Sequence, residues 1–511
     1  MRLLAAICVL VAALGIAASA KTEIFALPAS ASEVEDAIIE IDLERARALL
    51  ERASAEATRL AIERARLSIY LGECDSAAAQ LSSPTLTETK EGASLAALAR
   101  TCARATAAGF VIEDQKRGLW LRLQDDADRV LAPYLMDSAA RARDAICADL
   151  GVDLPRPLRI DLVRDQFSLS AVSGLPVTAA ETTGTLAVAR WGRVILLSPR
   201  AAMAGYPWQD TLAHEITHLV VTRATRDRAP LWLQEGTAKR EEARWRPARP
   251  FDDPNWADST ARFALADGRS IGIDQLGPSI AMLPTPEAAT IAFAEVSSFV
   301  KYWMAENGRP AMRLLFADLK GTAAADANPA LRSVTGYDLS EWNARWQAAL
   351  KEVPEDPRLE RERLPPPKDA RAAARDARLG DLLAERSHPR QALAVYRSAL
   401  ALGPAEPDLR WRVARMEQLL GEEAASAATL GTETDVRGAH AGWLALRGRA
   451  LRKAGRGPEA EATLEHALAL DPLSEDVACE GEVRPPGGSA HLPGDPAKRE
   501  LCASVQKPPG K

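Results

Sequence analysis

The feature that most constrains the fold is His-Glu-Ile-Thr-His at residues 214–218. Residues i and i+4 of a helix lie on the same face, so both imidazoles of this segment can reach one metal ion. The apolar residues in and around the segment favour a buried helix over about residues 208–222. The motif therefore predicts a metal ion held on a core helix, with Glu215 beside it.

A third ligand is needed, because a catalytic zinc ion usually has three protein ligands and one open position. The chain has six histidines, and apart from the two in the motif none precedes residue 388. We therefore expect a carboxylate ligand. The segment 230–236, Pro-Leu-Trp-Leu-Gln-Glu-Gly, supplies Glu235 on what the pattern indicates is the next helix.

Together these two segments resemble the gluzincin metallopeptidases, specifically the peptidase MA-like group related to aminopeptidase N and thermolysin. Those proteins pair H-E-x-x-H with a downstream W-L-x-E-G glutamate. The resemblance implies that Zn²⁺ is bound by His214, His218 and Glu235. It also implies hydrolysis of a peptide or protein substrate by activated water, with Glu215 as general base and then general acid.

The resemblance extends to an outer carboxylate. In the aminopeptidase-like relatives, an acid two helical turns beyond the third ligand hydrogen-bonds a ligating histidine. Glu242 has that offset from Glu235, and Glu241 is the neighbouring alternative. Such a carboxylate fixes the imidazole tautomer and raises its basicity.

One departure from the family concerns the oxyanion. Relatives carry a tyrosine that stabilises it, and the matching segment 293–300 has Phe293 in that place. Loss of one oxyanion donor commonly lowers turnover about 10²–10³-fold. Tyr302 is open to two interpretations, a substitute donor or a residue packed within its helix.

A second departure concerns the substrate's amine. Aminopeptidases bind it through a glutamate on a strand before the zinc helix, whereas the corresponding segment 184–189 has no acid. This strand can still bind an extended peptide through its backbone. We therefore expect an endopeptidase.

The pattern of the whole chain predicts a predominantly helical protein. We expect an α+β gluzincin-like peptidase domain flanked by all-α, tetratricopeptide-like regions. Alternating apolar residues predict strands at 119–123, 159–163, 185–189 and 193–197, with a long helix over 126–150. The expected organisation is a signal peptide (1–20), an N-terminal helical-hairpin region (21–108), the zinc peptidase domain (109–350), a Pro/charged linker (351–372), repeats (373–474) and a Pro/Gly-rich tail (475–511).

The repeats are inferred from a recurring set of small, aromatic and proline residues. The members of the second set follow those of the first at 68 residues, twice the 34-residue tetratricopeptide period, which places a degenerate repeat between them. The alternative is a generic helical bundle. Tetratricopeptide arrays bind proteins, so we expect a protein partner. The two sets are Gly380, Ala392, Tyr396, Ala399 and Pro404, and Gly448, Ala460, Leu464, Ala467 and Pro472.

Residues 1–20 have the pattern of a secretory signal, with Arg2, an apolar stretch and Ala-Ser-Ala at the end. The alternative is a membrane anchor, but about 15 apolar residues are short of the roughly 20 that a bilayer requires. We expect an exported, periplasmic or extracellular protein without a stable membrane span after signal removal.

Export permits disulfides. Cys479 and Cys502 flank the tail loop, and Cys74 and Cys102 both belong to the N-terminal helical region, so these two pairings are expected. Cys147 is then left as a buried thiol.

The formal charge of −6 argues against a nucleic-acid partner, which requires a basic surface. Two alternative functions stay open. One is a catalytically weak or inactive peptidase-like protein that serves as a binding scaffold. The other is a metal-dependent hydrolase with a non-peptide substrate.

Overall fold

The structure is a computed structural model that describes residues 30–53, 58–177, 185–202, 205–249, 252–322, 326–356, 369–402, 407–431, 440–479 and 496–506. The predicted signal peptide and most of the predicted linker lie outside the described residues, as do Gly184 and Pro404. Of the helices that are described, none has the length and apolar character needed to cross a bilayer.

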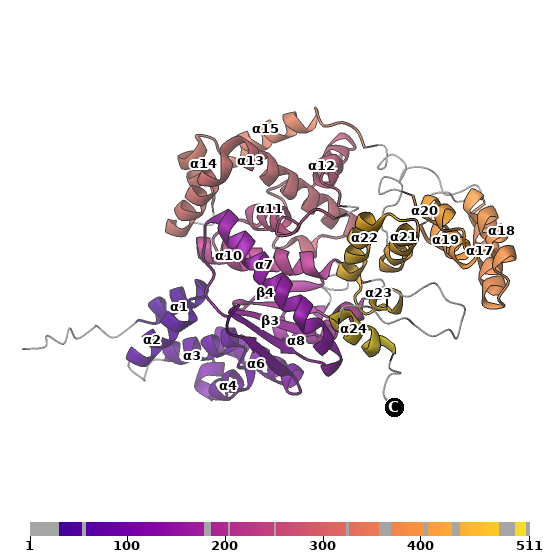
Figure 1. Cartoon of the computed structure of the whole chain (residues 1–511). Helices are drawn as coiled ribbons and strands as arrows, with labels where there is room; N and C mark the ends of the chain where they lie inside the picture. The colour runs from indigo at the N-terminus through magenta and orange to yellow at the C-terminus, as the bar shows by residue number, and fades with distance from the viewer. Residues whose placement is uncertain are drawn as a thin grey trace, which may run out of the picture.

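The N-terminal part is a set of short helices (Figure 1). They are α1 (Ala31–Ile39), α2 (Leu43–Arg52), α3 (Thr58–Leu71), α4 (Cys74–Gln80), α5 (Pro84–Thr87) and α6 (Lys90–Thr106). Ser30 and Glu33 cap α1 through reciprocal hydrogen bonds. A disulfide between Cys74 and Cys102 joins α4 to α6.

The described strands form one five-stranded sheet in the order β1-β2-β3-β5-β4. The strands are β1 (Phe110–Asp114), β2 (Leu119–Leu123), β3 (Leu158–Val163), β4 (Ala187–Arg190) and β5 (Arg193–Leu197). β2, β3 and β5 run parallel, and β1 and β4 are antiparallel strands at the two edges. β1 is not among the strands predicted from the sequence. No position of this edge strand is fully buried and Val111 is exposed, so the strand lacks a marked apolar pattern.

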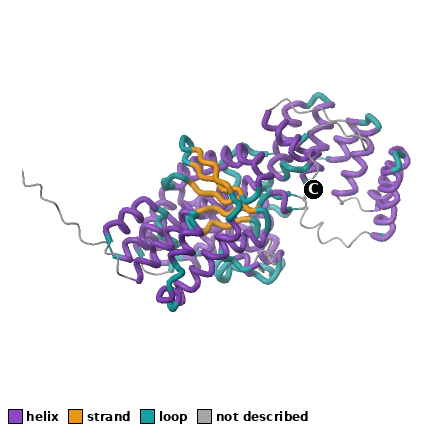
Figure 2. The backbone as a smooth tube through the Cα atoms, turned by 90° about the horizontal axis from the view of Figure 1, so that it is seen from below, coloured by secondary structure: helices purple, strands orange, loops and turns teal. Residues whose placement is uncertain are grey.

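Helices cover both faces of the sheet, so that it is an internal layer (Figure 2). Side chains alternate between the two faces along a strand. Val194 and Leu196 of β5 belong to the large core formed with α7 (Ala132–Leu150) and α10 (Trp208–Thr225). Ile195 and Leu197 pack instead with α8 (Gln166–Ser173) and the Cys74–Cys102 disulfide. The expected helix over 126–150 begins as a 3-10 turn, η1 (Asp126–Leu131), before α7.

Beyond α10 this domain is helical. The helices are α11 (Leu231–Glu241), α12 (Trp256–Ala266), α13 (Pro286–Gly321), α14 (Asn328–Thr335) and α15 (Leu339–Leu350). α13 bends at Gly308, whose φ of 76° is not helical and which lies two residues before Pro310. α11 packs on α13, which fixes the position of α11 beside α10.

The C-terminal part consists of helical hairpins, with α17 (Ala370–Glu385), α18 (Pro389–Leu402), α19 (Pro407–Leu419), α20 (Glu423–Leu430), α21 (Ala441–Lys453) and α22 (Gly457–Leu470). Two hairpins make the same close contact. A Cβ on Gly380 would lie 2.4 Å from the Tyr396 ring, and one on Gly448 would lie 2.6 Å from Cγ of Leu464. Equivalent positions of the proposed repeat therefore pack alike.

This part lies against the sheet-containing domain (Figure 1). The carbonyl of Leu470, at the end of α22, accepts a 2.9 Å hydrogen bond from the backbone N–H of Tyr206, just before α10. Cys479 and Cys502 form a disulfide that links the end of α23 (Glu475–Ala478) to α24 (Pro496–Gln506). Cys147 is a free thiol.

Candidate metal centre

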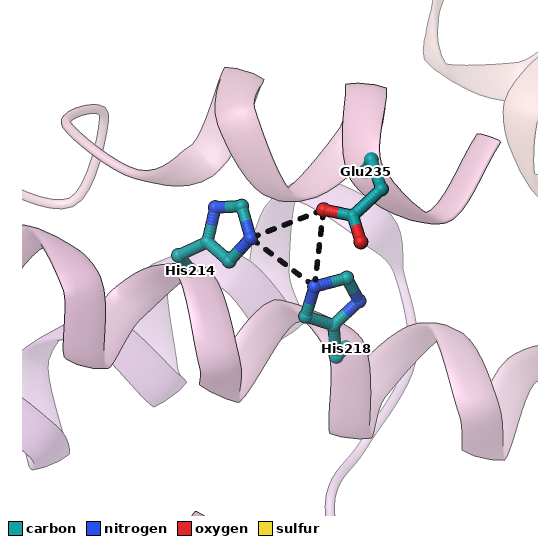
Figure 3. A group of neighbouring side chains, drawn as sticks. All are labelled: His214, His218 and Glu235. Carbon is teal, nitrogen blue, oxygen red and sulfur yellow. Dashed lines mark hydrogen bonds and ion pairs between the residues drawn. The ribbon is translucent and has the colours of Figure 1, made fainter. Parts of the chain in front are cut away.

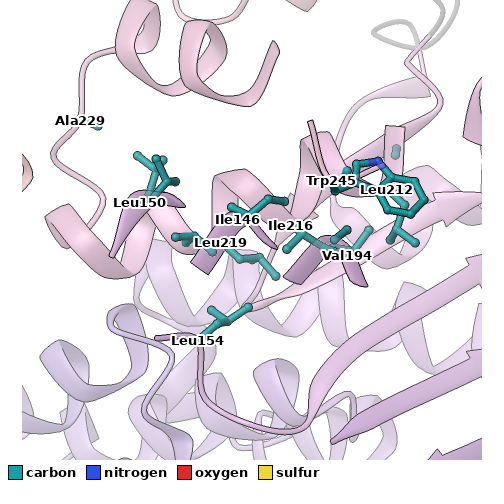
Figure 4. Packing of buried hydrophobic residues seen from close by; sticks show 14 of the residues in the cluster. Ile146, Leu150, Leu154, Val194, Leu212, Ile216, Leu219, Ala229 and Trp245 are labelled. Atoms are coloured by element: carbon teal, nitrogen blue, oxygen red, sulfur yellow. The ribbon is translucent and has the colours of Figure 1, made fainter. Parts of the chain in front are cut away.

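Helix α10 has one face in the core and another in a cleft. Ile216 and Leu219 lie in the same core cluster as Ile146 and Leu150 of α7 (Figure 4). The cleft of about 620 Å³ is lined by residues of α10 at helical spacing, Thr211, His214, Glu215, His218 and Thr222. The core-facing residues hold α10 in place and so direct both histidines into the cleft.

Helix α11 brings Glu235 to the same place. The helix begins directly after Pro230, which cannot donate a backbone hydrogen bond and is tolerated at a helix start. At Gly236 α11 lies very close to α13, since a Cβ there would lie 2.5 Å from the Val296 carbonyl oxygen. The absent side chain permits the close helix packing that positions Glu235.

The three side chains meet at one point (Figure 3). His214 Nε2 lies 3.2 Å from His218 Nε2 and 3.3 Å from Glu235 Oε2, and His218 Nε2 lies 3.6 Å from that oxygen. A tetrahedral zinc ion with bonds of about 2.0–2.1 Å separates its ligands by about 3.3–3.4 Å. The spacing thus fits three ligands of one such ion.

The chemistry of this donor set also fits a metal. Glu235 Oε2 is buried and makes no hydrogen bond of normal geometry, although two imidazole nitrogens face it. A buried carboxylate without a good partner is costly. A cation placed between the three atoms would satisfy it and both imidazoles.

Glu242 lies behind His214, as the resemblance implied. Its Oε2 is 3.3 Å from His214 Nδ1 and 2.7 Å from Lys239 Nζ. Glu241, the alternative, points elsewhere and pairs with Arg240 and Arg244.

The carboxylates change the proton affinities of the site. Burial alone would lower the pKa of His214, but the neighbouring carboxylates of Glu235 and Glu242 outweigh it and raise that pKa to about 10. Burial would raise the pKa of Glu242, yet Lys239 and His214 lower it to about 2. The pKa of Glu235 is likewise far below its usual range, because both imidazoles outweigh burial. The site is built to hold positive charge.

Glu215 is a cleft residue held by the edge strand. The backbone N–H of Ala189 in β4 donates a 2.6 Å hydrogen bond to Glu215 Oε2. This N–H is on the outer edge of β4, away from β5. The same strand segment, residues 185–189, lines the cleft.

Phe293 lines the cleft as well. Its ring centroid is 6.3 Å from that of His214, and Lys239 Nζ lies 5.2 Å from the ring centroid of Phe293. Tyr302 does not line the cleft and packs edge-on to Trp342 in the core. The structure therefore has Tyr302 as a packed residue and not as a substitute donor in the cleft.

Residues 139–352 match the family model of the Peptidase MA superfamily. The match supports a peptidase MA-like domain in this part of the chain. Among solved structures, native yeast LTA4 hydrolase is similar at 12% identity and a TM-score of 0.31, over 78% of this chain and 66% of that one. This chain thus spans slightly less than two thirds of that protein's length. No curated protein matches the chain.

Sequence reasoning did not single out the cleft residues Asp227 and Lys239, and it did not predict the hydrogen bond from Ala189 to Glu215. Lys239 is one turn after Glu235 on α11, so helical periodicity could have placed it near the metal ligands. Ala189 acts through its backbone, and Asp227 follows the end of α10. Neither has a sequence signal that marks it.

Proposed function

We propose that this protein is an exported zinc-dependent metallopeptidase that hydrolyses peptide bonds within chains, with Glu215 as general base and acid. The observation that carries the proposal is the triangle of His214 Nε2, His218 Nε2 and Glu235 Oε2, spaced for a tetrahedral ion beside a cleft carboxylate. We propose those three side chains as the zinc ligands.

When bound, zinc would polarise the scissile carbonyl and make water a stronger nucleophile. Glu215 accepts the proton of the attacking water and passes it to the nitrogen of the leaving amine. His214 donates its Nδ1–H to Glu242, which leaves the Nε2 lone pair directed into the triangle. Lys239 neutralises Glu242, so the outer carboxylate keeps its position without adding net charge to the cleft.

The edge strand β4 supports binding of an extended peptide. Its outer side has no neighbouring strand among the described residues, and its residues line the cleft. A substrate can add to such an edge by backbone hydrogen bonds. Residues 185–189 carry no acidic side chain that would bind a free amine, which favours cleavage within chains over removal of terminal residues.

Export and the repeats complete the proposal. The signal-like pattern of residues 1–20 supports transfer to the periplasm or the extracellular space. The matching contacts of Gly380 with Tyr396 and of Gly448 with Leu464 support tetratricopeptide-like repeats that bind a protein partner.

The test is zinc content and digestion of a peptide library by the purified mature protein. Glu215→Gln should keep zinc and lose hydrolysis, whereas the control Glu241→Gln, which removes an acid paired away from the cleft, should keep both. Unchanged hydrolysis in zinc-loaded Glu215→Gln would refute the proposed mechanism.

Phe293 favours a second candidate, a peptidase-like scaffold of very low turnover, because its ring brings no hydroxyl donor to the cleft. This candidate predicts bound zinc, no cleavage of any library peptide by the wild type, and retained partner binding through the repeats.

A further inference from the structure

The carboxylate of Asp227 lies in the cleft with no described lysine or arginine paired to it. It lines the cleft together with His218 and Thr222, and its side chain is accessible to solvent. None of the Lys or Arg side chains in the described residues makes an ion pair with it. The hydroxyl of Thr222 donates a hydrogen bond of 3.3 Å to Asp227 Oδ1.

The other carboxylates of the cleft differ in this respect. Glu235 faces two imidazoles, Glu242 pairs with Lys239, and Glu215 accepts the Ala189 N–H. Each is therefore committed to the metal site or to a neighbouring donor. Asp227 uses Oδ1 for the Thr222 hydroxyl, so its second carboxylate oxygen is available to accept a hydrogen bond from a ligand or from water.

The backbone holds Asp227 in this place. Arg226 and Asp227 both have left-handed φ angles, 54° and 59°, where the chain turns back at the end of α10. The Asp227 N–H closes the turn by donating to the Thr222 carbonyl at 3.0 Å. Two successive non-glycine residues in this conformation are costly, so the position is maintained by the surrounding structure.

The position relative to the metal ligands is set by α10. Thr222 follows His218 by one turn on the cleft face, about 5–6 Å along the helix. The Lys239–Glu242 pair lies at the other end, near His214, and is neutral as a pair. The cleft carboxylate without a lysine or arginine partner is thus at the His218 end, within reach of a long side chain one or two residues from the scissile bond.

We infer that Asp227 is a specificity-determining residue that binds a cationic group of the substrate, an inference that rests on the proposed peptidase function. Lysine and arginine side chains supply such a group, and so does a free α-amine. A charge-assisted hydrogen bond of this kind corresponds to about a 10–100-fold preference over an uncharged isostere.

The test compares matched peptides that have arginine, norleucine or glutamate at each position flanking the cleaved bond, with acetylated or free N-termini. Wild-type protein should cleave an acetylated arginine peptide about 10–100-fold more efficiently, in kcat/KM, than its norleucine counterpart. Asp227→Asn should abolish that difference yet cleave the norleucine peptide within about threefold of wild type. Asp227→Lys should favour glutamate. Asp274→Asn, an exposed aspartate outside the cleft, is the control with the same charge change.

Two outcomes would overturn the inference. In the first, wild-type protein shows no preference for a basic residue or a free amine. In the second, Asp227→Asn keeps the wild-type preference. A preference seen only with free N-termini would assign Asp227 to the amine and change the protein from endopeptidase to aminopeptidase.

Binding of the same peptides to zinc-loaded Glu215→Gln protein, with and without Asp227→Asn, separates the role of Asp227 from the proposed peptidase function. Absence of all hydrolysis by the wild-type protein would contradict the proposed function. The binding preference for arginine, and its loss in Asp227→Asn, still decides the role of Asp227.

Discussion

The contact of Gly236 with α13 leads to a quantitative prediction for Gly236→Ala. The added Cβ would lie 2.4 Å from Cγ2 of Val300 and 2.5 Å from the carbonyl oxygen of Val296. The valine side chain can adjust, but the carbonyl belongs to the backbone of α13. Because Cβ contacts below 3.0 Å are essentially never found, α11 and α13 must separate by at least about 0.5 Å.

Two terms set the magnitude. Overpacking of this kind costs about 1–3 kcal/mol, and the better helix propensity of alanine returns about 1 kcal/mol. We expect the metal-free variant to lose up to about 2 kcal/mol of unfolding free energy. Glu235 moves with α11, and a functional side chain displaced by about 0.5 Å is at the limit of productive geometry. Zinc affinity should therefore fall about tenfold or more.

The assay is chemical denaturation of metal-free wild-type and variant protein, with zinc affinity measured by competition against a chelating dye. Gly321→Ala is the matched control, because Gly321 ends α13 and a Cβ there would meet nothing within 4 Å. It should keep wild-type zinc affinity and unfold within about 1 kcal/mol of wild type. If Gly236→Ala matches wild type in both measurements, the helix spacing does not position Glu235.

Three further predictions follow from the same site. Glu242→Gln should weaken zinc binding about 10–100-fold, because His214 loses its charged partner; chelator competition measures this, and Glu241→Gln should leave the affinity unchanged. Phe293→Tyr should raise kcat by up to about 10²-fold at equal zinc content by adding a hydroxyl donor to the cleft, and an unchanged kcat would mean that another group already serves. The pKa of His214, about 10 in the metal-free protein, exceeds its unfolded value of 6.5, so its stabilising contribution is complete below about pH 6.5 and is lost as the pH rises through about 10. Zinc requires the neutral imidazole of His214, so zinc binding near pH 7 should release about one proton. Calorimetry in buffers of different ionisation enthalpy measures this release. Zero release would contradict the raised pKa of His214.

The sequence was most informative where one helix determines the geometry. Helical spacing alone puts His214 and His218 on one face, and the apolar residues in and around the motif explain why that helix is buried. Glu235 could be assigned as the third ligand, among the downstream carboxylates, only through a family resemblance. Its approach depends on the close contact of Gly236 with α13, a tertiary feature that no local pattern encodes.

Elements determined by edges and turns were harder to predict. β1 is a half-exposed edge strand, so its apolar residues do not stand out from the neighbouring helical pattern. Asp227 enters the cleft because the chain turns back through two left-handed residues. Aspartate is enriched in this conformation but arginine is not, so the pair does not mark the turn as glycine or asparagine would. Side chains and backbone groups placed by chain reversal therefore need the three-dimensional structure.

The hydrogen bond between Ala189 and Glu215 connects the edge strand to the proposed chemistry. A backbone N–H donates one strong hydrogen bond, and the outer-edge N–H of Ala189 is now donated to the carboxylate of Glu215. A peptide that added to β4 at this position would need the same N–H for its own carbonyl. Pairing of the substrate would thus release one oxygen of Glu215 at the moment when water requires a base. In the proposed function, the strand without an acidic side chain would contribute to the site through its backbone, because it would bind the peptide and so control when Glu215 is free to accept a proton.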